Sequence, residues 1–352
     1  MRNISQIDRN FEVKTKLKLD NAVFYDALEE PFSLYGVFYE NGMYRRMPEE
    51  VAKSVSPGVE SLHMHTAGGR LKFVTNSRYV AIKAVMPDIG KMPHFALTGS
   101  VGFDLYLGKK EEYCNSFIPP FGITDGYESV IRFDIRRQRE ITINFPLYSS
   151  VSELYIGLER DAVLKKAGEY RREKPMVFYG SSITQGGCAS RPGNAYTSML
   201  SRALNMDHIN LGFSGSAKAE DAMIQYIKGL EMELFVYDYD HNAPTVEHLH
   251  KTHQKMFRAI RQTQPELPIV ILSRPKYRLD DEEKQRLEVI RKTYEDALAE
   301  GDRNVWFIEG PALMKYARND GTVDGGHPND LGFWSMAKVL EKPLKNILNR
   351  RI

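Results

Sequence analysis

Hydrophobic and polar positions follow two different periodicities along this chain, and the periodicity changes between residues 159 and 175. Before that point, apolar residues recur at every second position, as in the runs 131–135, 141–143 and 154–158. Glycine, proline and aspartate separate these short runs. Period-two patterning with such breaks predicts antiparallel strands packed as an all-β sandwich, similar to a jelly roll.

Beyond residue 175 the chain alternates between short apolar runs and segments with helical spacing. Apolar residues and His253 recur three or four positions apart between Val246 and Ile260, which is typical of a helix with one buried face. The expected strands are 176–180, 208–211, 233–238, 268–273 and 304–308. Alternating strands and helices predict an α/β fold with a parallel sheet covered on both faces. Ligands of such sheets bind beyond the carboxyl ends of the strands.

The change of periodicity also predicts the domain organisation. We expect an N-terminal β-sandwich domain over residues 1–165, a linker over 166–175 and a C-terminal catalytic domain over 176–352. The chain from Glu159 to Lys174 is rich in charge and is closed by Pro175, which favours a connector.

Composition excludes several classes of function. The 48 basic residues nearly balance the 46 acidic ones, so the formal net charge of +2 gives no reason to expect nucleic acid or anionic membrane as a partner. The first ten residues lack the apolar stretch of a signal peptide, and the longest apolar runs are too short to span a bilayer. The two cysteines, Cys114 and Cys188, are typical of a reducing compartment. A cytoplasmic location is therefore expected, with a secreted protein whose signal segment has been removed as the alternative.

Candidate chemistry is concentrated at two points of the second half. The apolar run 177–179 ends in glycine and is followed by Ser181 and Ser182, so a serine is expected at a strand-to-helix turn, where its hydroxyl can meet a substrate. Asp324 and His327 stand three residues apart near the C-terminus. A hydroxyl, an imidazole and a carboxylate are the parts of an activated serine nucleophile. Thr184 stands where the Gly-x-Ser-x-Gly elbow of α/β-hydrolases requires glycine, which argues against that fold.

Four segments, in order, resemble the signature blocks of the SGNH (GDSL-type) hydrolases: 180–184 (GSSIT), 210–215 (NLGFSG), 240–242 (DHN) and 324–328 (DGGHP). In the first half, 102–106 (GFDLY) resembles the Gly-x-Asp-Leu-Tyr signature of a β-sandwich that precedes some esterases of this family. The resemblance implies a three-layer, flavodoxin-like catalytic domain that needs no cofactor and no metal.

Carried over residue by residue, the resemblance implies that Ser182 is the nucleophile, His327 its general base and Asp324 the group that orients the base. The backbone N–H groups of Ser182 and Gly215 and the side-chain amide of Asn242 would form the oxyanion hole. Two departures weaken the match: Ser181 replaces the usual aspartate before the nucleophile, and the third block lacks its usual glycine and following aspartate.

Simpler roles exist for the same residues. Ser182 could cap a helix, the Asp324 to His327 segment could be a polar turn, and Gly215 could serve a turn. His248, His250 and His253 lack a zinc-protease pattern and are expected to be structural or solvated.

Three side chains are candidates for substrate binding. His241 is adjacent to Asn242, Arg191 follows the nucleophile turn, and Arg274 follows a predicted strand end. Cys188 is expected to be a small packed residue.

Together these features predict a serine esterase that hydrolyses small acyl esters, most simply acetyl esters of carbohydrate, through an acyl-serine. The expected partner is a small-molecule or oligosaccharide ester. A lipid or thioester acylhydrolase would use the same residues, and a catalytically silent carbohydrate-binding protein remains the alternative from another class.

Overall fold

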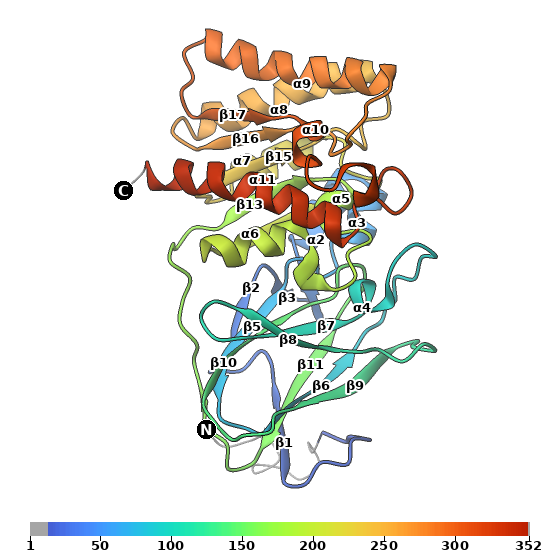
Figure 1. The fold of residues 1–352 in the computed structure, drawn as a ribbon, viewed down its shortest axis with the longest axis vertical. Coiled ribbons are helices and arrows are strands. Elements are labelled where there is room, and N and C mark those ends of the chain that lie inside the picture. The colour runs from blue at the N-terminus through green and yellow to red at the C-terminus, as the bar shows by residue number, and fades with distance from the viewer. Residues whose placement is uncertain (1–12, 351–352) are drawn as a thin grey trace.

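The computed structural model describes residues 13–350, which form a β-sandwich followed by an α/β unit (Figure 1). The sandwich consists of two antiparallel sheets. In order across the first sheet, the strands are β1 (Ala22–Asp26), β11 (Glu153–Glu159), β6 (Tyr79–Val85) and β9 (Gly126–Arg132). The second sheet contains β12 (Leu164–Lys165), β5 (Arg70–Thr75), β10 (Arg139–Asn144), β7 (Phe103–Leu107) and β8 (Glu112–Phe117), with β2 (Ser33–Tyr35) also paired to β5.

The sandwich core lies between these two sheets. Ile141 and Ile143 of β10 pack in one apolar cluster with Ile82 of β6 and Ile156 of β11. The alternation noted for 141–143 and 154–158 therefore marks strands whose apolar side chains face the sandwich core, as predicted.

The run 131–135 was predicted as one strand, and this prediction is wrong at its carboxyl end. Strand β9 ends at Arg132, which pairs with Tyr79, the first residue of β6. One further backbone hydrogen bond, from the N–H of Phe133 to the carbonyl oxygen of Arg78 at 2.7 Å, continues the pairing, and beyond it Ile135 lies 64% exposed. The alternation continued past the point where pairing stops.

The second half is built on a five-stranded parallel sheet with the order β14-β13-β15-β16-β17. The strands are β13 (Met176–Gly180), β14 (His208–Gly212), β15 (Leu234–Asp238), β16 (Ile269–Leu272) and β17 (Val305–Ile308). Each agrees with its predicted range within one residue at either end. The order is that of a flavodoxin-like doubly wound sheet, so the predicted fold class is confirmed for both halves.

Helices cover both faces of this sheet (Figure 1). One face packs against α7 (Asp221–Lys228), α8 (Val246–Thr263) and α9 (Asp281–Ala299). The other packs against α6 (Tyr196–Leu204), α10 (Gly310–Leu313) and α11 (Asp330–Asn349). Because both faces are covered, the strands are mostly apolar, which is why the sequence predicts them as short hydrophobic runs.

Two helices from the first half of the chain pack into the core of the second half. The hairpin β3 (Phe38–Glu40) and β4 (Met43–Arg45) leads into α2 (Glu49–Val55) and α3 (Pro57–Leu62). Ala52 and Val59 of these helices join the core on the α7 face. The buried Arg46 donates hydrogen bonds to the carbonyl oxygens of Asn210 (3.0 Å) and Gly212 (2.6 Å) at the end of β14. The two halves are therefore interlocked.

Within residues 13–350, no helix is both long enough and apolar enough to cross a membrane.

Candidate active site

The nucleophile turn is held by the serine that precedes Ser182. Strand β13 ends at Gly180, and the short helix α5 (Ser182–Gln185) starts two residues later. The Ser181 hydroxyl accepts a hydrogen bond from the backbone N–H of Ile183 at 3.2 Å, so Ser181 is the N-cap and Ser182 the first helical residue. Serine and aspartate cap helices about equally well, so the replacement at this position keeps the turn intact.

Two distant segments meet at this turn. The Oγ atom of Ser182 lies 2.9 Å from Nε2 of His327, across 145 residues of sequence. On the other side of the ring, Nδ1 of His327 lies 2.7 Å from Oδ2 of Asp324. With the ring proton on Nδ1, donated to the carboxylate, Nε2 is free to accept the serine proton. The three predicted residues are thus joined in one hydrogen-bonded chain.

The loop that carries the imidazole is organised by the same aspartate. Oδ1 of Asp324 accepts hydrogen bonds from the backbone N–H groups of Gly326 (2.9 Å) and His327 (2.7 Å). Partial burial pushes the pKa of Asp324 up, but these N–H donors and the His327 ring hold it well below its usual range. Asp324 therefore stays ionised and can stabilise a protonated imidazole.

The two other predicted donors follow β14 and β15, the strands on either side of β13. Gly215 has φ +68°, a left-handed conformation that favours glycine, and a Cβ there would meet no protein atom within 4 Å. Oδ1 of Asn242 accepts a hydrogen bond from the N–H of Ala217 at 3.4 Å. This contact directs the oxygen of the amide toward the loop and leaves its NH₂ group as the donor.

His241, next to Asn242 in the chain, is half-buried. Burial lowers the pKa of His241 well below its usual range, and the nearby charges of Arg274 and His327 lower it further. Its Nε2 atom is buried and has no hydrogen-bond partner among residues 13–350. His241 is thus a neutral imidazole with an unused polar atom near the site.

The two arginines named as candidates are engaged with the protein. Arg191 forms an ion pair with Asp104 at 3.2 Å, and its guanidinium lies 3.8 Å from the centre of the Tyr113 ring. Arg274 forms an ion pair with Glu283 at 3.1 Å. Neither side chain has a contact that brings it to Ser182 or His327 in this structure.

Several residues of the sandwich half lie beside Ser182 or His327, and none of them was predicted from the sequence. The Tyr148 hydroxyl donates to the carbonyl oxygen of Ser182 at 3.1 Å, and Phe95 packs edge-on against the Tyr148 ring. The ring centre of His94 lies 5.5 Å from that of His327. Nothing local in the sequence marks these residues, because each matters only through a contact with the other half.

The Gly-x-Asp-Leu-Tyr segment holds the loop that follows the nucleophile helix. Oδ2 of the fully buried Asp104 accepts hydrogen bonds from the N–H of Gly193 (2.8 Å) and from Arg191, while Oδ1 accepts one from Asn144 (2.7 Å). Tyr106 lies against Gly193. The segment therefore acts as a contact between the two halves.

The same loop is tied to the histidine segment. Asp330, three residues after His327, accepts hydrogen bonds from the backbone N–H of Ser190 (2.9 Å) and from Asn194 (2.9 Å). Loop 190–194 thus connects the sandwich to both catalytic segments.

Replacing Gly193 with alanine tests this contact. A Cβ there would lie 2.6 Å from ring carbons of the buried Tyr106, so we expect the free energy of unfolding to fall by about 1–3 kcal/mol. The matched control is Gly229→Ala, whose Cβ would be 3.5 Å from its nearest neighbour; its effect should stay within about 0.5 kcal/mol. Urea denaturation measures both, and equal effects would contradict the assignment.

A buried carboxyl group lies directly behind the nucleophile turn. Oδ2 of Asp238, the last residue of β15, accepts hydrogen bonds from the hydroxyl groups of Thr184 (2.8 Å) and Tyr196 (2.9 Å). Burial raises the pKa of Asp238 to about 7, although these hydroxyl groups lower it in part. In the unfolded chain an aspartate titrates near 3.9.

Asp238 should therefore make stability depend on pH. Between about pH 4 and 7 the folded state binds a proton that the unfolded state has lost, so the free energy of unfolding contributed by this group falls as pH rises and levels off above about 7. Asp238→Asn removes the titration. We expect the difference between wild type and variant to decrease by about 3–4 kcal/mol from pH 4 to pH 8. Parallel denaturation curves across this range would contradict the prediction.

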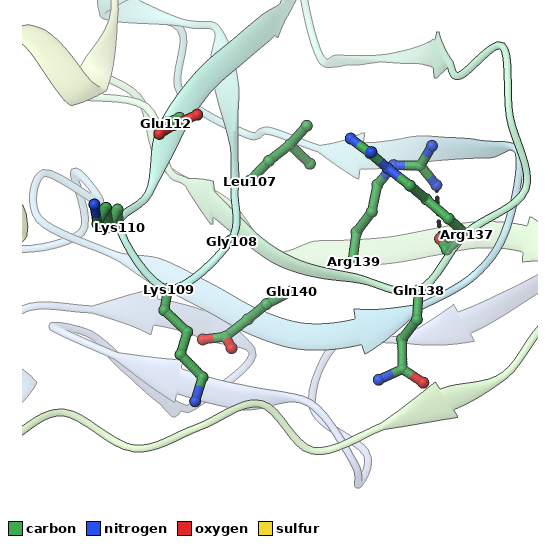
Figure 2. Close-up of a pocket in the computed structure, with 9 residues that line it drawn as sticks. All are labelled: Leu107, Gly108, Lys109, Lys110, Glu112, Arg137, Gln138, Arg139 and Glu140. Atoms are coloured by element: carbon green, nitrogen blue, oxygen red, sulfur yellow. Dashed lines mark hydrogen bonds between the residues drawn. The ribbon is translucent and has the colours of Figure 1, made fainter.

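A separate hollow of about 440 Å³ lies at the edge of the second sandwich sheet (Figure 2). It is lined by the turn between β7 and β8 and by the start of β10, with Lys109, Lys110 and Arg137 around it. Arg139 is turned onto the Phe133 ring and donates to the carbonyl oxygen of Arg137 at 2.7 Å. No serine or histidine lines this hollow, so it is not a second site of the same chemistry.

The fold and site define a three-layer α/β protein with a serine, a histidine and an aspartate joined at the carboxyl edge of the sheet. Residues 173–345 match the GDSL-like lipase/acylhydrolase family, and residues 22–164 match the N-terminal domain of SGNH-hydrolase-type esterases. The chain belongs to the SGNH (GDSL-type) hydrolases that carry this N-terminal domain. No curated protein matches it.

Solved structures agree with this assignment. A GDSL-like lipase from Bacteroides ovatus is 29% identical, with a TM-score of 0.83 over 94% of this chain and 98% of its own. The salicylyl-acyltransferase SsfX3 of a tetracycline biosynthetic pathway is 18% identical, with a TM-score of 0.76 over 94% and 98%. An acetyl xylan esterase from Butyrivibrio proteoclasticus is 13% identical, with a TM-score of 0.60 over 94% and 99%. The last two show a shared fold.

Proposed function

We propose that this protein is a serine esterase that cleaves small acyl esters, with acetylated carbohydrate as its substrate class. The observation that carries the proposal is the unbroken chain of hydrogen bonds from Ser182 through His327 to Asp324, at 2.9 and 2.7 Å. A hydroxyl group is a poor nucleophile until a base takes its proton, and this arrangement supplies the base.

The reaction proceeds in two halves. Ser182 attacks the ester carbonyl while its proton moves to Nε2 of His327, and the oxyanion is held by the N–H groups of Ser182 and Gly215 and the amide of Asn242. His327 then gives the proton to the leaving alcohol, which leaves an acyl-serine. Water attacks the acyl group with His327 again as base, and the acid is released.

Replacing Asn242 with alanine should remove one donor to the oxyanion. We expect kcat to fall by about 10²–10³-fold with little change in KM, because the donor is needed most when charge develops on the oxygen. Asn242→Asp, of the same shape, places a carboxylate beside the oxyanion and should be at least as inactive. An effect confined to KM would contradict the role.

The choice of acetylated carbohydrate as the substrate class is supported by analogy with a structural relative. The structural relative from Butyrivibrio proteoclasticus is named an acetyl xylan esterase. The test is acetate release from a panel of acetylated oligosaccharides, compared with release from p-nitrophenyl acetate. The proposal requires at least one oligosaccharide to exceed the synthetic ester in kcat/KM.

The second candidate is a lipid or thioester acylhydrolase, favoured by the name of the 29% identical relative. Esters of increasing acyl length separate the two. A rise in kcat/KM from acetyl to long acyl chains would favour the lipid substrate, and a steep fall would favour acetyl esters.

The third candidate, a catalytically silent carbohydrate-binding protein, requires a site in which the serine can no longer be activated. The cap supplied by Ser181 and the alignment of His327 argue against such a loss. Covalent labelling of Ser182 by a fluorophosphonate, located by peptide mapping, would exclude this alternative, and failure to label would favour it.

A further inference from the structure

Three side chains with metal-binding atoms converge at the entrance to the site. His94 lies in the stretch between β6 and α4 (Leu97–Ser100), Cys188 follows α5, and His327 is the proposed base. One ligand atom from each lies within 4.8 Å of the other two. The sandwich half thus contributes one of the three groups, which explains why no local sequence motif marks the set.

The chemistry of this set is selective. Two imidazoles and a thiol suit Zn²⁺ and similar soft divalent cations, whereas Mg²⁺ and Ca²⁺ require oxygen ligands. Around a tetrahedral zinc ion, nitrogen and sulfur ligands lie about 3.5 Å from one another, so small side-chain rotations would close the present spacing. Catalytic zinc sites likewise have three protein ligands, with water in the fourth position.

Asp324 completes the arrangement. Nδ1 of His327 is committed to Oδ2 of Asp324 at 2.7 Å, which leaves Nε2 as the atom available to a cation. A carboxylate behind a metal-binding histidine is the usual way to fix the ring and strengthen it as a ligand. The hydrogen bonds that prepare His327 as a base therefore also prepare it as a metal ligand.

We infer that His94, Cys188 and His327 form a binding site for Zn²⁺, and that its occupation switches the esterase off. The metal–sulfur bond forms as the Cys188 thiol releases its proton to solvent. The lone pair on Nε2 of His327 goes to the metal, so it cannot accept the proton of Ser182. The binding part of this inference is independent of the proposed function, and the inhibition part rests on it.

Without a metal, Cys188 is not a competing nucleophile. Burial raises the pKa of its thiol to about 12, and the nearby charge of Asp324 contributes to the rise. The thiol is therefore neutral at physiological pH. Cys188 is buried, and its sulfur lies beside the two imidazoles.

The first experiment measures binding alone, with Co²⁺ as the probe and metal-free full-length protein. Wild type should show the near-ultraviolet charge-transfer band of a cobalt–thiolate bond. Cys188→Ser should lose the band, and His94→Asn should weaken Co²⁺ affinity by at least about tenfold. Cys114→Ser, which alters the other free cysteine, is the matched control and should leave the spectrum unchanged. Ser182→Ala should keep the band, because serine is not a ligand.

The second experiment measures inhibition of ester hydrolysis by Zn²⁺, with each variant compared with its own metal-free rate. Zn²⁺ should inhibit wild type and Cys114→Ser equally, and EDTA should reverse the inhibition. Cys188→Ser and His94→Asn should each require at least about tenfold more Zn²⁺.

The inference is overturned if wild type shows no cobalt–thiolate band, or if Zn²⁺ inhibits both ligand variants as strongly as wild type. If the band follows the expected pattern but metal-free wild type hydrolyses no ester, the site stands and the proposed function fails.

Discussion

Ser182→Ala is expected to lower kcat for ester hydrolysis by about four orders of magnitude or more. Ser182 supplies the only hydroxyl group of the hydrogen-bonded chain Ser182–His327–Asp324. Among residues 13–350, it is the hydroxyl that lies within hydrogen-bond distance of Nε2 of His327. Without the serine, the imidazole and the oxyanion donors can assist only attack by water, which accounts for a small residual rate.

The adjacent serine provides a matched control. Ser181→Ala removes the helix cap, so it should cost about 0.5–2 kcal/mol of stability while leaving the nucleophile in place. Ser182→Ala should show the opposite pattern, with near-normal stability and almost no activity. Hydrolysis of p-nitrophenyl acetate and labelling by a fluorophosphonate measure the two variants. A Ser182→Ala protein that hydrolyses this ester at a rate near wild type would disprove the assignment.

The parallel sheet was predictable because its central strands are buried on both faces and are therefore mostly apolar. Every residue of β13 and β15 is buried, and apart from Asp238 at the end of β15 each strand is a continuous apolar run. The same reasoning failed at the end of 131–135, where the alternation continues to the exposed Ile135 but the backbone pairing stops at Phe133. Periodicity reports what a segment could bury, whereas the length of a strand also depends on the strand beside it.

The serine, the histidine and the aspartate that the structure joins by hydrogen bonds could be named from sequence because two short motifs carry them. The contribution of the sandwich half could not. Tyr148 and His94 meet Ser182 and His327 only in the folded chain, and no spacing rule connects residues so far apart in sequence. Asp104 was visible as part of a signature, but its task of holding Gly193 needed the folded chain.

These contacts give the β-sandwich a physical task at the site. Asp104 holds the loop that follows the nucleophile helix, and Asp330 ties the same loop to the segment that carries His327. The two catalytic segments are thus fixed relative to each other partly through residues of the first half. The sandwich is therefore part of the framework that holds the candidate site.

Asp324→Asn is expected to lower kcat by about 10⁴-fold, and the structure supplies the reason. Oδ1 of Asp324 accepts two backbone N–H groups, so the oxygen of an asparagine would take that place and its NH₂ group would face Nδ1 of His327. A donor at that position forces Nδ1 to be the acceptor and moves the ring proton to Nε2. The base would then present a proton to Ser182 where it must accept one.

The control is Asp320→Asn, an exposed carboxylate four residues upstream in the same loop, whose replacement should leave kcat within about twofold because it removes no buried contact. Both variants should keep near-normal KM, and the rate of fluorophosphonate labelling of Ser182 should fall with kcat for Asp324→Asn alone. If Asp324→Asn retained more than about a tenth of wild-type kcat, the imidazole would need no carboxylate, and the catalytic unit would be a serine–histidine pair in which Asp324 only shapes the loop.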